Sequence, residues 1–166
     1  MNVKSSMSIL AVMLLFAFST LAFAHCEIPC GIYHDKMRID MWEEQITTVE
    51  KSMTEIIELS QAGEKNYNQI VRWVNNKKKH ADDIREIAVQ YFLAQRIKPV
   101  ADANDKAAVE KYVNTLQVLH NIIIETMKAK QTTDLQHVEM LRNLVKQFYK
   151  LYFDEEMQEH LEEDHH

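Results

Sequence analysis

The fold is decided by residues 36–62, which read KMRIDMWEEQITTVEKSMTEIIELSQA. Apolar side chains recur here every three or four residues, the spacing that places them on one face of an α-helix. They are Trp42, Ile46, Val49, Met53, Ile56 and Ile57. Gly63 follows and is expected to cap the end of the helix. We therefore predict a long amphipathic helix over residues 36–62.

Three further segments show the same spacing, and turn-forming residues separate them. The second covers about residues 64–97 and must end before Pro99, which cannot continue a helix. The third follows Asp105, and we expect Thr132 or Thr133 to cap the fourth. Their apolar stripes comprise Tyr67, Ile70, Val71, Val74, Ala81, Ile84, Ala88 and Tyr91, then Val109, Tyr112, Val113, Leu116, Leu119, Ile123 and Met127, then Leu135, Val138, Leu141, Leu144, Val145, Phe148, Leu151 and Tyr152.

Four amphipathic helices with short connections form an up-down four-helix bundle, so we predict an all-α fold with this bundle over residues 34–154. The chain has 166 residues but only 2 Gly and 2 Pro, too few for a β-rich fold with many tight turns. No helix of the bundle carries the Glu-x-x-His element of di-iron bundles, so its core is expected to be a scaffold. Residues 155–166 are predicted to form an acidic, His-containing tail that is the frayed end of a helix.

Residues 1–24 read MNVKSSMSILAVMLLFAFSTLAFA and are typical of a secretory signal peptide. Lys4 is their only charge, and the unbroken apolar stretch over residues 9–18 is shorter than the ~20 residues of a membrane span. Residues 22–24 fit the small-x-small site that signal peptidase cleaves. We expect export to a periplasm, a lumen or the outside of the cell, with His25 as the first mature residue. The alternative is an uncleaved membrane anchor.

Charge and cysteine content exclude several classes of protein. The formal net charge is −6 and becomes −7 once Lys4 is removed, whereas binding to nucleic acid requires a basic face. Two cysteines are too few for a disulfide-rich scaffold or a four-thiolate zinc site. Their position carries more information than their number.

Both cysteines lie in residues 25–33, which read HCEIPCGIY. Cleavage before His25 creates a free α-amine, and the backbone nitrogen of Cys26 lies one chelate ring away. These two nitrogens and the Cys26 sulfur can occupy three corners of a plane, and Cys30 can close the fourth if residues 27–29 fold back as a hook. A planar set of nitrogens and thiolates suits Ni(II) or Cu(II) better than Zn(II), which prefers a tetrahedron.

This stretch closely resembles the nickel-binding hook of nickel superoxide dismutases, His-Cys-x-x-Pro-Cys-Gly-x-Tyr, and matches every fixed position from His25 to Tyr33. The resemblance implies one nickel ion per subunit. Its ligands would be the thiolates of Cys26 and Cys30, the His25 amine and the Cys26 amide, with the His25 imidazole as an axial ligand of the oxidised metal. It implies conversion of superoxide to dioxygen and hydrogen peroxide by Ni(III)/Ni(II) cycling, with Tyr33 beside the open face. It also implies a helical bundle that assembles as a homohexamer.

Some supporting residues depart from the pattern of that family. Asp40 corresponds best to the glutamate that steadies the axial imidazole, and His80 falls where an arginine supports it. A second tyrosine, expected shortly before Pro99, has no clear counterpart, because Gln95 and Arg96 lie nearest after a one-residue insertion. The second shell is thus predicted to comprise Asp40 and His80.

Superoxide is an anion and the mature chain is acidic, so any attraction must be local. Lys36, Arg38 and the lysine run over residues 77–79 would focus the field if they lie near the hook; the alternative for the run is a solvated helix face. Three isolated histidines are expected at the surface or the edge of the core: His34, His120 and His137.

Two alternatives to the enzyme remain open at this level. Cys26 and Cys30 could form a disulfide after export, although a bridge over so small a loop would stabilise the bundle little. A non-catalytic nickel or copper carrier could use the same hook. A carrier needs an exposed and exchangeable metal, whereas an enzyme needs a protected, redox-active one.

Overall fold

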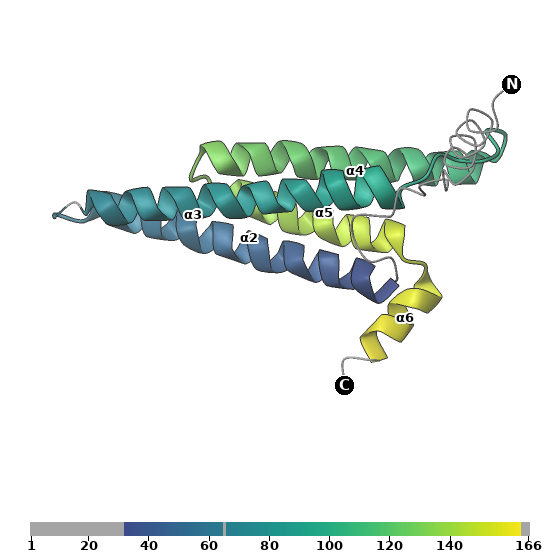
Figure 1. Ribbon diagram of the computed structural model, residues 1–166, viewed down its shortest axis with the longest axis horizontal. Helices are drawn as coiled ribbons and strands as arrows, with labels where there is room; N and C mark the ends of the chain where they lie inside the picture. Colours follow the sequence, from purple (N-terminus) through teal and green to yellow (C-terminus); the bar gives the residue numbers. More distant parts are fainter. Residues whose placement is uncertain (1–31, 65, 164–166) are drawn as a thin grey trace, which may run out of the picture.

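The computed structural model describes residues 32–64 and 66–163, and every regular element in those ranges is a helix (Figure 1). They are α2 (Ile32–Gln61), α3 (Tyr67–Glu86), the π-helix η1 (Ile87–Arg96), α4 (Lys106–Gln131), α5 (Gln136–Tyr152) and α6 (Glu155–Glu163). The predicted all-α bundle is confirmed, with α2, α3 continued by η1, α4 and α5 as its long helices. The predicted signal peptide, residues 1–24, and the hook up to residue 31 lie outside the described residues.

The long helices run up and down along one axis. α2 packs along α3, and α4 packs along α5, while further contacts join α3 to α4 and α2 to α5. Figure 1 shows the α2–α3 and α4–α5 turns toward one end of the bundle, and the start of α2, the end of η1 and the end of α5 toward the other. The segment from which the hook departs therefore lies at the end where three elements meet.

Aromatic rings fill the core near that end. Trp42 is fully buried, with its ring centroid 4.9 Å from that of Phe92 and 5.4 Å from that of Phe148. Its indole nitrogen donates a 2.9 Å hydrogen bond to the carbonyl oxygen of Ile84. This satisfies the polar atom of a buried tryptophan, which would otherwise cost stability. Trp42 thus joins α2 to α3, η1 and α5.

The predicted second helix is one continuous rod, but its last ten residues are wound as a π-helix rather than an α-helix. The amide of Ile97 bonds the carbonyl of Phe92 at 2.9 Å, a spacing of five residues instead of four. Each such turn holds an additional residue relative to an α-helical turn. The rod ends at Ile97, which is extended and lies two residues before Pro99, so the helix stops before the proline as predicted.

The predicted stripe of the first helix is correct except for Ile57, which is only partly buried, and the other stripes are correct only in part. In α4 the buried face carries Thr115, Val118, Leu119, Ile122 and Thr126. It is thus rotated from the predicted stripe, because that face accepts small polar residues that an apolar count ignores. Several predicted core residues are instead exposed: Tyr67, Val71, Val113, Met127 and Leu135.

The capping residues at the other helix ends agree with the sequence only in part. The Asp105 carboxylate caps α4 by accepting a hydrogen bond from the amide of Ala108 at 3.0 Å, as expected for an aspartate at this position. Gly63 does not adopt the left-handed conformation of a glycine cap, and α2 ends two residues before it. A threonine cap on α5 is also wrong: Thr132 ends α4, and Asp134 accepts the amide of Gln136 at 2.9 Å.

The acidic C-terminal segment is more ordered than a frayed helix end. After an extended Phe153, the chain turns into the separate helix α6. Leu161 is 3% exposed, and Met157 packs against the core. Two apolar side chains four residues apart thus hold one face of α6 against the bundle.

None of the helices in the described ranges is both long and apolar enough to cross a membrane.

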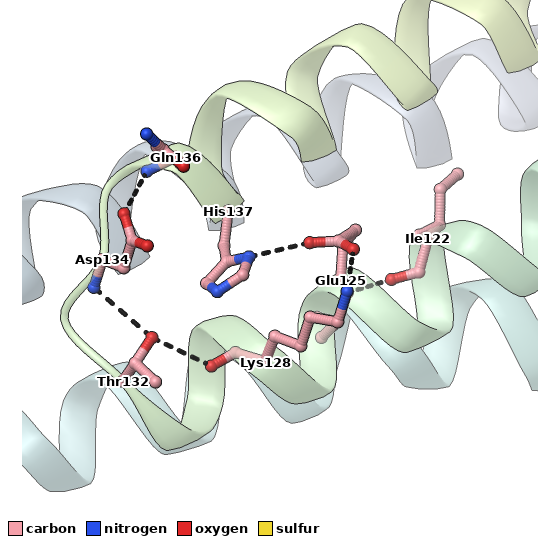
Figure 2. A network of polar contacts seen from close by, with 8 residues as sticks. Ile122, Glu125, Lys128, Thr132, Asp134, Gln136 and His137 are labelled. Carbon is pink, nitrogen blue, oxygen red and sulfur yellow. Dashed lines mark hydrogen bonds and ion pairs between the residues drawn. The ribbon is translucent and has the colours of Figure 1, made fainter.

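A buried carboxylate lies beside the α4–α5 turn (Figure 2). Glu125 accepts hydrogen bonds from His137 at 2.8 Å and from Lys128 at 2.7 Å. Burial alone would raise the pKa of Glu125, but these two partners outweigh burial and lower it from its ordinary value. His137 is therefore at the edge of the core, as predicted, and it links α5 to α4.

We predict that Glu125→Gln lowers the free energy of unfolding near neutral pH by about 1–3 kcal/mol, because His137 and Lys128 lose a buried anionic acceptor. The pKa of Glu125 is lower in the folded than in the unfolded protein. Its contribution to the free energy of unfolding is therefore present above the pKa of an unfolded glutamate, about 4.3, and is lost as pH falls through the folded pKa. Urea titrations at a series of pH values should show the difference between wild type and variant shrinking in acid. The exposed Glu110→Gln serves as control and should have little effect. A difference that stays constant through the acid range would contradict the assignment.

Candidate functional site

The first turn of α2 carries a buried acid at the end of the bundle where the hook departs. Asp35 is 2% exposed and lies two residues after Tyr33 and five after Cys30. The Tyr91 hydroxyl donates to one carboxylate oxygen, and the Arg96 guanidinium pairs with the other. The Tyr152 hydroxyl donates to that second oxygen at 2.8 Å. Three donors therefore surround one carboxylate.

Each donor comes from a different position in the fold. Tyr91 lies in the middle of η1, Arg96 is its last residue, and Tyr152 is the last residue of α5. Arg96 also donates to the Tyr152 hydroxyl at 3.2 Å, which connects the network on both sides of Asp35. We call these four residues the Asp35 cluster. It ties the start of α2 to the ends of η1 and α5.

Burial and hydrogen bonding hold both phenols of the cluster in their neutral form. Burial, followed by the hydrogen bond to Asp35, raises the pKa of Tyr152 to about 12. The same two causes raise the pKa of Tyr91 well above the usual range for tyrosine. Burial would lower the pKa of Arg96, but its bonds to Asp35 and Tyr152 outweigh burial and raise it. Both hydroxyls thus remain donors and Arg96 remains a cation.

The two predicted supporting residues lie further along the α2–α3 pair. Asp40 pairs with Lys36 one turn earlier on α2, and its side chain is half exposed. His80 on α3 contacts Gln45 on α2 through its Nδ1 atom, and that atom lies 3.8 Å from Asp83. These are the contacts that the structure shows for the two residues. Their predicted role behind the axial ligand stays a prediction.

The predicted cations separate into different environments. Lys77 is buried, donates to the carbonyl of Thr132, and has a pKa lowered by burial. Lys79 pairs with Asp83 at 2.6 Å. Arg38 lies over the ring of Tyr91, with the guanidinium carbon 5.3 Å from the ring centroid. The lysine run is therefore not one positive patch.

Arg38 and Lys79 nevertheless share a groove between α2 and the rod formed by α3 and η1. Gln45, Tyr91 and Glu86 also line it. The Nε atom of Arg38 is buried there without a hydrogen-bond partner among the described residues. Acidic and basic side chains both line this groove, so its charge is mixed.

The predicted ligands His25, Cys26 and Cys30 lie outside the described residues. Tyr33 lies in the first turn of α2, where the structure describes its backbone only. Residues 32–64 and 66–163 contain no group of three or more histidine, cysteine or carboxylate side chains placed to hold a metal ion.

Sequence reasoning missed the role of the Asp35 cluster. In sequence, Tyr91 and Tyr152 belong to apolar stripes, and Arg96 is only a residue near the position of an expected second tyrosine. One signal was available: an aspartate at the start of an apolar stripe has to be exposed or paired. The partner could not be identified, because the π-helix shifts the faces of Tyr91 and Arg96.

The comparisons with known proteins bear on this arrangement. A family model described as nickel-containing superoxide dismutase matches residues 20–156. The chain belongs to this family. The enzyme therefore converts superoxide to dioxygen and hydrogen peroxide with nickel, and the matched range includes the whole hook and the Asp35 cluster. No curated protein and no solved structure gives a significant match.

We predict that Tyr152→Phe lowers the free energy of unfolding of this dismutase by about 1.5–3 kcal/mol near neutral pH, since Asp35 loses one donor. The exposed Tyr67→Phe is the control and should change it little.

Tyr152→Phe should also change how the free energy of unfolding depends on pH above about 10. The pKa of Tyr152 is raised in the folded protein above the unfolded value of about 10. Its contribution to the free energy of unfolding is therefore fully present below pH 10 and is lost as pH rises toward about 12. Chemical unfolding at stepped pH should show a shallower alkaline decline in Tyr152→Phe than in wild type. An equal decline in both proteins would contradict a half-buried Tyr152 phenol that stays neutral.

Proposed function

We propose that the mature enzyme begins at His25 and holds one nickel ion per subunit within residues 25–33. The single observation that carries this is the position of the hook pattern, which directly follows the predicted cleavage site and lies inside the range matched by the family. The ligands would be the Cys26 and Cys30 thiolates, the His25 amine and the Cys26 amide, with the His25 imidazole joining them when the metal is oxidised.

The chemistry of this donor set fits nickel. Two thiolates and an ionised amide are anionic donors, and such donors stabilise a higher oxidation state than water or carboxylate ligands do. When bound, nickel supplies the one-electron couple that exchange with superoxide requires. The protein supplies the charge, the arrangement of donors and the protection from competing reactions.

Elements next to the hook support anionic sulfur. Cys30 lies two residues before the start of α2, and the free amide groups of a first helical turn favour negative charge. Tyr33 follows within that turn, which suits a role in holding water or a small anion beside the metal. The His25 amine exists only after cleavage, so maturation would itself complete the ligand set.

Export and assembly complete the proposal. A signal peptidase would remove residues 1–24 and deliver the enzyme to a periplasm, a lumen or the outside of the cell. The subunits would form a homohexamer, as the family resemblance implies. Tyr67 and Val71, exposed four residues apart on α3, supply apolar surface for such contacts.

We predict that the chain starting at His25 binds one nickel ion and dismutes superoxide, whereas one additional residue before His25 abolishes both, because it replaces the amine with an amide. Nickel content, superoxide consumption and the electron paramagnetic resonance spectrum would be measured on both forms. The double variant Cys26→Ser, Cys30→Ser should lose nickel and activity.

Full activity in the extended chain or in the double variant would overturn the ligand set. Nickel bound without turnover would favour a carrier that uses the same hook. The control is Lys51→Ala, an exposed position on α2, which should keep both nickel and activity.

A further inference from the structure

The Asp35 cluster contributes more than stability to the start of α2. The Asp35 side chain is 3% exposed and meets Tyr91, Arg96 and Tyr152. Withdrawing a carboxylate from water costs free energy, and a buried ion pair often stabilises a fold no more than apolar side chains of similar size. What such a network adds is a defined geometry, because every hydrogen bond must be met at once.

No other buried side chain anchors the first turn among the residues described there. Lys36 and Arg38 are partly exposed, and Met37 is 44% exposed. The next buried side chain on α2 is Ile39, one turn later. Asp35 is therefore the first residue of α2 at which the described structure holds the helix to its neighbours.

This anchor lies directly after the hook in the chain. Asp35 follows Cys30 by five residues and Tyr33 by two, with the first turn of α2 between them. A helical turn transmits a displacement of its base to the residues that precede it, because its backbone hydrogen bonds make it stiff. A shift of Asp35 would accordingly move the point from which the hook departs.

We propose that Asp35 is a positioning residue that fixes the base of the nickel hook through its bonds to Tyr91, Arg96 and Tyr152. The proposal rests on the proposed function for the identity of the bound metal. By this proposal, η1 and α5 support the metal centre through the Asp35 cluster, although both are distant from the hook in sequence. Substitution of Asp35 should loosen the hook without removing any ligand.

The decisive variant is Asp35→Asn, which keeps the shape of the side chain but loses the charge that pairs with Arg96. In the mature nickel-loaded protein, we expect nickel to be released to a chelator about ten- to a hundredfold faster, matching the loss of metal affinity that follows when outer-shell groups are changed. The electron paramagnetic resonance spectrum should change shape. Arg96→Lys keeps the charge but loses the planar fork, and it should shift both readouts less, in the same direction.

Two control variants separate positioning from a general loss of stability. Glu50→Gln breaks another contact between α2 and α5, the 2.7 Å pair with Arg142, about four helical turns further along α2. Glu125→Gln removes another buried carboxylate, at the α4–α5 turn. Both should leave nickel release within about twofold of wild type, because neither touches the base of the hook.

A second readout needs no metal. In the metal-free protein, the backbone amides of residues 36–39 bond the first four carbonyls of α2, so their hydrogen exchange reports on that turn. Asp35→Asn should accelerate their exchange at least about tenfold relative to both controls.

The outcomes separate the two proposals. Nickel release or exchange in Asp35→Asn equal to that in the controls would overturn the positioning role. If the wild-type protein binds no nickel, the proposed function fails, while hydrogen exchange in the metal-free protein still decides whether Asp35 fixes the first turn. If Asp35→Asn does not fold, Arg96→Lys supplies the same two readouts.

Discussion

Burial of the Trp42 indole is the contact on which the described fold depends. Its ring lies against Phe92 and Phe148, and its nitrogen is satisfied by the carbonyl of Ile84, so a single side chain on α2 meets α3, η1 and α5. Truncating a buried tryptophan to alanine typically lowers the free energy of unfolding by about 3–5 kcal/mol. The Asp35 cluster lies two turns away on α2 and shares the ring of Tyr152 with this core. Apolar packing thus brings together the helices that the polar cluster aligns.

Sequence periodicity was sufficient for the fold because the first helix repeats a strict stripe from Trp42 to Ile56, and all the stripe residues in that range are buried. It was weaker for α4, where Thr115 and Thr126 face the core and satisfy their hydroxyls on the preceding turn of their own helix. A threonine that bonds its own backbone is indistinguishable in sequence from an exposed one. The rotated face of α4 follows from that ambiguity.

In the candidate site, too, one part is visible in the sequence and another part is not. The hook pattern is local in sequence, so His25, Cys26 and Cys30 are recognisable without any tertiary information. Asp35 and Tyr152 are separated by more than a hundred residues, and only the packing of α5 on α2 brings them into contact. Long-range polar pairs of this kind carry no signature in a single sequence. The sequence therefore identifies the short metal motif, whereas only the structure identifies the residues that support it.

The π-helical winding of η1 also determines which way each later residue of the rod points around the helix axis. Each residue of an α-helix advances the chain by about 100° around the axis, so one residue more or fewer in a rod rotates its whole C-terminal portion by that angle. Tyr91 and Arg96 both contact Asp35 although they lie five residues apart, the spacing of the π-helical hydrogen bond. An α-helix would place residues five apart on different faces. The wider winding is thus what lets a single segment present two donors to one carboxylate, and it ties the length of η1 to the integrity of the cluster.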